Sequence, residues 1–528
     1  MKVLLVPPTF RYATEYPAFL SFSDFPSGWG YLASSLKQAG HEVYGCNPNN
    51  IVGYVNVYSM LQSVLSQKIA QVKPELIGLG GLCVDYRFLK DTIGIIRQID
   101  PTIPIVLGGQ IVTNDAEFIF NDLKPDYAVE GDGEYAITRL CASLPAVANI
   151  PNLWFWEGEK AQHITSGMEP RLLRELENDI DNLSFPDYSP FGIDEMLDEY
   201  SMATRVLYRY SRPDPRPFNI VASRGCPFAC TFCVDHHRSY RARSIENIME
   251  EIRVSYERYK FNILILLDEL FAVSRSRLND FSQAVLRGKE QYGWDFDWCF
   301  QTHASARFDL ESLKLAKQAG CYMFSYGLES ASPTVLKSMD KRIRIEQVVE
   351  VIKLAEETGI GFSANLIFGD VAETVDTISE SLAFWFKYGQ RCCLFLAEVK
   401  PYPGSALFTQ CLERGLIKDK KSYYETIDTV PINMTAMDDR TYAAMMSLLA
   451  QLEQGWLFPQ KAMDVHYEVE SNHRGKYQTY VSGDYYKVTA RCPYCGGESR
   501  YRQLMPGVPF MLGLSCLKCQ RKIKVEVS

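Results

Sequence analysis

The chain has 528 residues, which is more than one hydrophobic core supports and suggests roughly three or four domains. Hydrophobic residues make up 47% and charged residues 23%, the composition of an ordinary soluble globular protein. The net charge of −9 disfavours a broad nucleic-acid footprint, and no apolar run approaches the roughly 20 residues of a membrane span.

Residues 1–145 alternate short apolar runs with amphipathic stretches, the pattern of a parallel sheet wrapped by helices. The first run leads straight into Pro7 and Pro8 without a small-residue cleavage site. We therefore interpret it as a strand rather than a signal peptide, and we expect a cytoplasmic protein. The expected strands are residues 3–6, 43–46, 76–79, 103–107 and 127–129.

Glycine-rich or proline-rich turns follow four of these strands. Ligands of open α/β sheets bind beyond the carboxyl ends of the strands, where glycines let a ligand approach the backbone closely. We therefore expect a small-molecule or nucleotide-like site there, with mere tight turns as the alternative. The turns are Pro7-Pro8-Thr9, Gly80-Gly81-Leu82, Gly108-Gly109-Gln110 and Gly131-Asp132-Gly133-Glu134.

Four further regions follow. Residues 146–205 are expected to be a linker, and residues 206–405 form a second α/β series whose six units predict a full or partial β/α barrel. Residues 406–480 are expected to be mostly helical, and residues 481–528 to form a small domain with a cysteine cluster. The strands expected in the barrel are residues 218–222, 263–267, 298–302, 323–326, 362–368 and 394–400.

Three cysteines, Cys226, Cys230 and Cys233, follow the first strand of the barrel. Their thiolates can reach three irons of one [4Fe–4S] cubane and leave the fourth iron open for a substrate or cofactor. The alternative is a structural zinc site completed by His236 or His237. Zinc knuckles usually pair two CxxC halves, and no second half is nearby, so the spacing favours the iron–sulfur cluster.

This loop, with Phe232 before its last cysteine, resembles the signature of the radical S-adenosylmethionine (SAM) superfamily. The resemblance implies that SAM chelates the open iron through its amino and carboxylate groups. One electron then cleaves SAM to methionine and a 5′-deoxyadenosyl radical, which abstracts a hydrogen atom from the substrate. An electron donor such as flavodoxin or ferredoxin is expected as a partner.

Other strand ends of the barrel resemble cofactor-binding motifs of this family. An acidic pair resembles the motif that meets the SAM amino group, and a Gly-Leu-Glu-Ser segment resembles the polar motif near the methionine and ribose. A glycine-containing loop resembles the adenine-side loop, with Val371 in place of the usual proline. The residues concerned are Asp268 and Glu269, then Gly327, Glu329 and Ser330, then Gly369, with Gln301 and His303 facing the same mouth.

An α/β domain placed before such a barrel resembles the cobalamin-binding subfamily. The better-known cobalamin mutases supply an axial histidine from an Asp-x-His-x-x-Gly motif, which this sequence lacks, so we expect a lower cobalamin face free of histidine. A degenerate domain that binds nothing is the alternative. The residues expected to contact cobalamin are Pro8, Thr9, Gly80, Leu82, Gly108, Gly109, Gln110, Glu130 and Gly131.

The resemblance implies a methyltransferase, in which methylcobalamin hands a methyl group to a substrate radical. One SAM remethylates the cobalamin and a second makes the radical, so an unactivated carbon of a small-molecule or peptide-derived substrate is methylated. A cyclase or rearrangement enzyme would share these motifs. A non-catalytic cobalamin or redox sensor is disfavoured by the intact cysteine loop. A tRNA methylthiotransferase is disfavoured by the acidic balance and by the arrangement of Cys46, Cys83 and Cys141.

Two CxxC knuckles near the C-terminus, separated by 20 residues, predict a tetrahedral four-thiolate site. We expect zinc in a structural role at Cys492, Cys495, Cys516 and Cys519, with a rubredoxin-like iron or an auxiliary cluster as the alternative. The remaining eight of the 15 cysteines are expected to be small buried core residues. They are Cys46, Cys83, Cys141, Cys299, Cys321, Cys392, Cys393 and Cys411.

Overall fold

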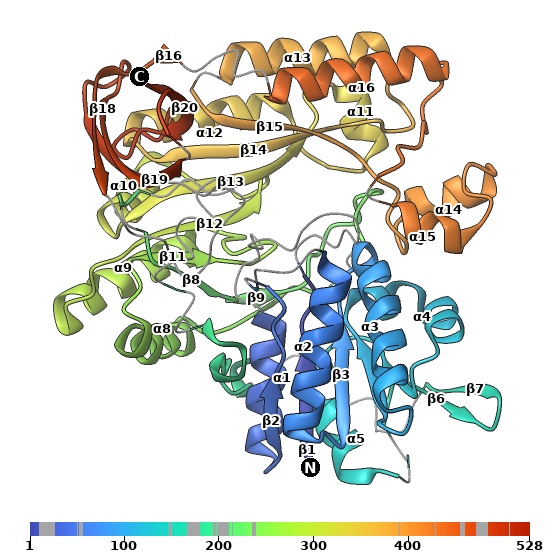
Figure 1. The fold of residues 1–528 in the computed structure, drawn as a ribbon. Coiled ribbons are helices and arrows are strands. Elements are labelled where there is room, and N and C mark those ends of the chain that lie inside the picture. The colour runs from blue at the N-terminus through green and yellow to red at the C-terminus, as the bar shows by residue number, and fades with distance from the viewer. Residues whose placement is uncertain are drawn as a thin grey trace. The chain divides into compact units, whose positions relative to one another are not determined.

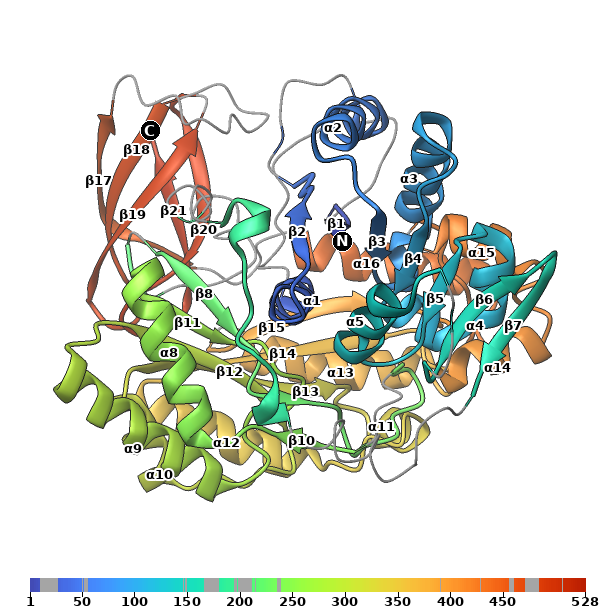
Figure 2. The ribbon, with the colours of Figure 1, turned by 90° about the horizontal axis from the view of Figure 1, so that it is seen from below.

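In the computed structural model the chain forms two compact units (Figures 1 and 2). Unit 1 contains residues 1–196, 234–237 and 402–430, and unit 2 contains residues 197–233, 238–401 and 431–528. The described residues are 1–9, 27–49, 51, 56–145, 147, 150–165, 180–193, 197, 211–213, 215–234, 239–389, 391–427, 429–454, 460–470, 484–505 and 507–528.

The core of unit 1 is a sheet with the strand order β2-β1-β3-β4-β5-β6-β7, whose first five strands are parallel. Helices connect these strands, which confirms the predicted parallel α/β domain. The order in which the strands are added to the sheet reverses between β1 and β3, and doubly wound sheets bind ligands at this position. The strands are β1 (Lys2–Val6), β2 (Glu42–Gly45), β3 (Leu76–Gly80), β4 (Ile105–Gly108) and β5 (Tyr127–Val129). The helices are α1 (Ser27–Gln38), α2 (Val57–Val72), α3 (Tyr86–Ile99), α4 (Gln110–Leu123) and α5 (Gly133–Ser143).

A hairpin extends this sheet where the sequence predicted a linker. Strands β6 (Leu153–Glu157) and β7 (Lys160–Ile164) are antiparallel, and β6 pairs with β5. The Trp156 ring stacks on the Phe120 ring of α4, with 4.6 Å between centroids. The prediction of a linker over residues 146–205 is therefore wrong for this hairpin, because its aromatic residues bury apolar surface against α4. The acidic stretch at residues 177–179 lies outside the described residues.

A segment that follows the barrel in sequence also belongs to unit 1. It contains α14 (Ala406–Glu413) and α15 (Lys420–Thr426). The Tyr424 ring stacks on the Phe118 ring with 5.3 Å between centroids, and Lys420 Nζ lies 3.0 Å from both carboxylate oxygens of Asp115. The sequence placed these helices in one region with residues 431–480, and the structure divides that region between the two units.

We expect the Lys420–Asp115 pair to contribute measurably to the stability of unit 1. Asp115 sits at a non-helical kink of α4 and also accepts a hydrogen bond from the Tyr424 hydroxyl at 3.2 Å. Replacing Lys420 by methionine should lower the free energy of unfolding by about 1–2 kcal/mol, because a half-buried carboxylate loses a charged partner. Urea unfolding measures this change. The exposed Lys418→Met is the control, and an equal loss there would contradict the assignment.

Unit 2 is built on six parallel strands in the order β15-β14-β13-β12-β11-β8. Helices alternate with the strands, and β15 and β8 form the two edges of the sheet. The predicted partial (β/α)6 barrel is therefore confirmed. The strands are β8 (Pro217–Ile220), β11 (Ile263–Leu266), β12 (Asp297–His303), β13 (Cys321–Glu329), β14 (Gly361–Phe368) and β15 (Cys393–Glu398). The helices are α8 (Ile245–Tyr259), α9 (Arg275–Tyr292), α10 (Leu310–Gln318), α11 (Pro333–Ser338), α12 (Ile345–Thr358), α13 (Val375–Tyr388) and the later α16 (Asp439–Gln454).

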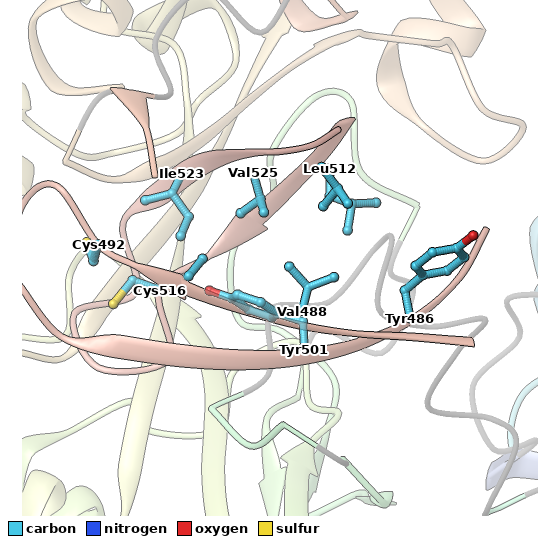
Figure 3. Close-up of a cluster of buried hydrophobic side chains, with 10 residues drawn as sticks. Tyr486, Val488, Cys492, Tyr501, Leu512, Cys516, Ile523 and Val525 are labelled. Atoms are coloured by element: carbon cyan, nitrogen blue, oxygen red, sulfur yellow. The ribbon is translucent and has the colours of Figure 1, made fainter. Parts of the chain in front are cut away.

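The C-terminal part of unit 2 is a small β domain with its own apolar core (Figure 3). Two three-stranded sheets form it, in the orders β17-β18-β19 and β16-β21-β20. The domain begins near residue 460, so the predicted helical region ends earlier than expected. Its strands are β16 (Gln460–Lys461), β17 (Met463–Glu470), β18 (Asp484–Arg491), β19 (Glu498–Met505), β20 (Phe510–Ser515) and β21 (Lys522–Val527), and its labelled core includes Tyr486, Val488, Tyr501, Leu512, Ile523 and Val525.

The eight scattered cysteines are all buried, which confirms their predicted packing role. None of the described helices combines the length and the apolar character that a membrane crossing requires.

Candidate active site

A network of hydrogen bonds fixes the chain between β8 and the three-cysteine loop. Asp268, just after β11, accepts hydrogen bonds from the Ala222 backbone N–H and the Ser223 hydroxyl, both at 2.7 Å. Arg277 donates to the Ala222 carbonyl at 3.1 Å. Burial raises the pKa of Asp268 to about 6. Both carboxylate oxygens of Asp268 are thus hydrogen-bonded to the start of the loop, whereas its neighbour Glu269 is exposed at the strand end.

The three cysteines lie on one loop after the short strand β9 (Ser223–Arg224). Gly225, directly before Cys226, has a φ of 79°, a backbone conformation that favours glycine. Cys226 and Cys230 are half-buried and Cys233 is exposed, and the Thr231 backbone N–H donates to the Met339 carbonyl at 3.1 Å. One half-open loop with three thiols fits a cluster that keeps an accessible iron. His236 and His237 lie outside the described residues.

A buried ion pair stands beside this loop. Lys341 Nζ lies 3.0 Å from Glu329 Oε1, with side chains 7% and 12% exposed. The same ammonium group lies 5.7 Å from the centroid of the Phe232 ring, within range of a cation–π interaction. Glu329, the last residue of β13, has a φ of 66°, and the pairing of β13 with β14 shifts register between Tyr326 and Glu329. Burial raises the pKa of the Cys230 thiol, and the positive charge of Lys341 partly offsets that rise.

His303, at the end of β12, packs on the same loop. Its ring stacks on Phe228 with 3.8 Å between centroids, and Nδ1 accepts a hydrogen bond from the Ser305 backbone N–H at 3.1 Å. The neutral imidazole therefore carries its proton on Nε2. Burial, together with the charge of Lys341, lowers the pKa of His303 to about 4. His303 is thus a neutral side chain at neutral pH.

This lowered pKa predicts a loss of stability on mild acidification. The folded pKa of about 4 lies below the ordinary value of 6.5, so protonation favours the unfolded chain. The contribution is complete above pH 6.5 and is lost as the pH falls from 6.5 toward 4. Between pH 7.5 and pH 5 we expect a loss of about 2 kcal/mol in the free energy of unfolding, measured with urea under anaerobic conditions. His303→Gln should lose correspondingly less, and an identical pH dependence would contradict this role.

The other predicted residues at the barrel mouth take different places. A Cβ atom on Gly327 would lie 2.7 Å from Lys341 Nζ and 2.8 Å from Glu329 Oε1, so the ends of these two side chains would have to shift. Ser330 is buried, and its hydroxyl hydrogen-bonds to Ser381 of α13 and accepts from the Ser332 backbone N–H at 3.1 Å, so it ties its loop to that helix. Gly369 has a φ of 109°, and its N–H donates to the carboxylate of Glu373. This bond closes the loop, although Val371 stands where the family usually has proline. Gln301 remains exposed on β12.

The glycines at the strand ends of unit 1 bring two turns into direct backbone contact. A Cβ atom on Gly80 would lie 2.8 Å from the Gly108 carbonyl oxygen, and one on Gly109 would lie 2.7 Å from the Gly81 carbonyl oxygen. The Ile111 backbone N–H donates to the Gly81 carbonyl at 3.0 Å. The turns after β3 and β4 thus form one continuous backbone surface at their glycines. Helix α4 begins beside it, at Gln110.

Two side chains lie where the strand order reverses, between β1 and β3, and suit a bound ligand. Thr9, after β1, is buried, and its Oγ1 is a buried atom without a hydrogen-bond partner in the described chain. Leu82, after β3, is 49% exposed. The adjacent Pro8 carbonyl accepts a hydrogen bond from the Asn49 side chain at 2.9 Å. An orphaned hydroxyl, an exposed apolar side chain and a glycine-lined surface fit the large, partly apolar ring of a corrinoid.

Glu130 and Gly131, also predicted to meet the cofactor, are tied to their own domain. The Glu130 carboxylate accepts a hydrogen bond from the Trp154 indole and lies 3.3 Å from His163 Nε2. Gly131 donates its N–H to the Thr113 hydroxyl at 2.9 Å. The Glu130 side chain therefore holds the β6–β7 hairpin. His41 contacts the amino group of Met1, which places it at the opposite end of the strands from the glycine turns.

The four tail cysteines come together as predicted. Their sulfur atoms all lie within 4.8 Å of one another, with Cys492 and Cys519 at 3.7 Å and Cys495 and Cys516 at 3.6 Å. Tetrahedral zinc with Zn–S bonds of about 2.3 Å separates its sulfurs by about 3.8 Å. The arrangement therefore fits one four-thiolate ion.

Comparisons with known proteins agree with this division of the chain. Residues 220–384 match the radical SAM superfamily, and residues 24–141 match the B12 binding domain. An uncharacterized methyltransferase from Pyrococcus horikoshii is 26% identical over 440 residues, covering 81% of this chain and 87% of that protein. An anaerobic magnesium-protoporphyrin IX monomethyl ester cyclase from Rubrivivax gelatinosus is 25% identical over 441 residues, covering 80% and 72%.

Solved structures share much of this fold. The radical SAM methyltransferase TsrM from Kitasatospora setae has a TM-score of 0.62 at 17% identity, covering 79% of this chain and 77% of that one. The barrel with its three-cysteine loop, preceded by a B12-binding domain, defines a radical SAM enzyme. The chain combines a B12-binding domain with a radical SAM domain, the arrangement of cobalamin-binding radical SAM enzymes, and relatives that match about 80% of it are named as methyltransferases and as cyclases.

Sequence reasoning missed Lys341. In the sequence it lies in the loop after α11 and directly follows no strand, and a single lysine between Asp340 and Arg342 looks like a surface residue. Only its burial against Glu329 and Phe232 distinguishes it.

Proposed function

We propose that this chain methylates an unactivated carbon of a small molecule, using a [4Fe–4S] cluster, SAM and cobalamin. The observation that carries this proposal is the half-open loop of Cys226, Cys230 and Cys233 at the barrel mouth, in a chain that also has a B12-binding domain. When bound, these groups would supply hydrogen-atom abstraction and a transferable methyl group. Each methyl group transferred consumes two SAM molecules and two electrons. A flavodoxin or ferredoxin would supply the electrons.

The residues of the chain hold and shape this chemistry. The three cysteines would bind three irons, while Asp268 and Arg277 keep the start of their loop in place. Glu329 and Lys341 set opposite charges beside the loop, where the amino and carboxylate groups of SAM need partners. The neutral ring of His303 supports the loop through Phe228 without adding charge. Thr9, Leu82 and the glycine turns would hold the corrinoid.

The test is anaerobic reconstitution with iron, sulfide and hydroxocobalamin, followed by SAM, a strong reductant and a candidate substrate. Bound corrinoid is read from its visible spectrum, and products are read by mass spectrometry. Methylation predicts 5′-deoxyadenosine and S-adenosylhomocysteine in about equal amounts, with a substrate heavier by one CH₂ unit. Cys230→Ala should abolish 5′-deoxyadenosine, whereas Cys141→Ala, at a buried cysteine of unit 1, should not. Continued cleavage by Cys230→Ala would refute the cluster assignment.

A cyclase is the second candidate, because a relative that matches 80% of this chain carries that name. It would use the same cluster and SAM but would form a ring instead of adding a methyl group. In the experiment above, this outcome appears as 5′-deoxyadenosine without S-adenosylhomocysteine and without a methylated product.

The tail would hold zinc in this proposal. The sulfur separations of 3.7 and 3.6 Å match a tetrahedral thiolate site, and a closed four-thiolate ion is structural rather than catalytic. Metal analysis of the purified chain tests this assignment. One zinc per chain, lost in Cys516→Ser/Cys519→Ser, supports it, and iron bound there in place of zinc would refute it.

A further inference from the structure

The two metal knuckles of the tail have the same backbone but differ at one position. The residue after the second cysteine of each knuckle is left-handed, with a φ of 67° at Gly496 and 59° at Gln520. Each donates its N–H to the carbonyl of the first cysteine of its knuckle, both at 2.9 Å. Glycine suits this conformation, whereas a residue with a Cβ atom adopts it at a cost. The second knuckle therefore keeps a strained glutamine where the first has glycine.

The Gln520 side chain explains why that strain is retained. It is buried, and its Cβ and Cγ lie over Gly361, the first residue of β14. A Cβ atom on Gly361 would lie 2.8 Å from the Gln520 Cβ and 3.3 Å from the Met323 Cγ. The glutamine thus fills a notch that exists because residue 361 has no side chain. The left-handed backbone of Gln520 and the absence of a side chain at Gly361 are thus both needed for this one contact.

The next two residues continue this contact across the same end of the barrel. Arg521 Nη2 lies 3.7 Å from Glu356 Oε1 in the last turns of α12. Lys522 Nζ lies 5.3 Å from the centroid of the Phe395 ring on β15. Three consecutive residues of the metal domain therefore touch a strand, a helix and the edge strand. For Gly496, by contrast, nothing lies within 4 Å of an added Cβ atom.

We propose that the second knuckle is a metal-dependent clamp on the barrel, in which Gln520 docks into the Gly361 notch and holds the N-terminal end of β14. The four-thiolate ion shapes this knuckle, because Cys516 and Cys519 are ligands on either side of its turn. β14 runs from Gly361 to Phe368 and leads into the Gly369–Glu373 loop at the other end of the barrel. Loss of the tail metal is therefore expected to affect the Gly369–Glu373 loop, because β14 connects the clamp to that loop. This proposal rests on a metal in the tail and not on methyl transfer.

Hydrogen–deuterium exchange of the full chain with its iron–sulfur cluster tests the clamp, together with zinc analysis. In Cys516→Ser/Cys519→Ser, which should lose zinc, amides of residues 361–366 should exchange about tenfold faster. Gln520→Gly removes the docking side chain and the strain, so it should keep zinc yet show the same faster exchange in residues 361–366. Lys518→Ala, an exposed lysine of the same knuckle, is the matched control and should behave like the parent chain.

Gly361→Ala tests the contact from the barrel side. Its methyl group would collide with Gln520, so zinc should remain while residues 516–522 exchange faster. This variant and Gln520→Gly decide the question even if the double cysteine variant does not fold. Unchanged exchange of residues 361–366 in Gln520→Gly would overturn the clamp, even with zinc present. Absence of zinc from the parent chain would instead refute the metal assignment.

Discussion

Replacing Lys341 by methionine is expected to lower the free energy of unfolding by about 3–5 kcal/mol. The ammonium group of Lys341 is the ion-pair partner of Glu329, and both side chains are almost fully buried. Removing one partner of a buried ion pair leaves an uncompensated charge, which costs about this much. The same change removes the cation beside Phe232, so iron retention should also fall. Urea unfolding and iron analysis under anaerobic conditions measure both effects.

Two further variants separate the charge from the packing. Lys341→Met/Glu329→Gln removes both charges and should recover most of the lost free energy, because no buried charge is left without a partner. Lys337→Met, at an exposed lysine of α11, should change the free energy of unfolding by no more than about 0.5 kcal/mol. If the double variant were as unstable as Lys341→Met, the ion pair would not be the cause.

Gly109→Ala is expected to destabilise unit 1 by about 3–5 kcal/mol and to abolish corrinoid retention. Gly109 has φ 86° and ψ −178°, a region that only glycine occupies readily. The added methyl group would also lie 2.7 Å from the Gly81 carbonyl oxygen and 2.8 Å from the Gly81 nitrogen. These are backbone atoms, so the two turns must separate. Urea unfolding measures the stability, and co-elution of hydroxocobalamin on gel filtration measures binding.

Gly94→Ala is the matched control for this substitution. Gly94 lies within α3, and nothing stands within 4 Å of an added Cβ atom. Alanine is the better helix former by about 1 kcal/mol, so this variant should be as stable as the parent chain or more stable. Normal corrinoid retention by Gly109→Ala would contradict the assignment of the glycine turns to the site.

Local patterns determined much of the fold. Apolar runs alternating with amphipathic stretches predicted both parallel sheets, because burial on both faces leaves that pattern in the sequence. Spacing alone predicted the three-cysteine loop and the paired tail knuckles, because the cysteines of the first group lie in one loop and those of the second on two matching turns. The roles of individual side chains at the strand ends were harder to predict from the sequence. Asp268, Glu130 and Ser330 are polar and well placed in sequence, yet their hydrogen bonds hold the protein itself.

The sequence by itself thus determined the two α/β units, the position of the cluster loop and the four-thiolate tail. Only the tertiary structure showed that residues 402–430 return to unit 1, that Lys341 pairs with Glu329, and that Gln520 docks against Gly361. The physical reason is that each of these contacts joins residues far apart in the chain, or depends on a left-handed backbone. Periodicity records which face of an element is buried, but not which distant side chain covers it.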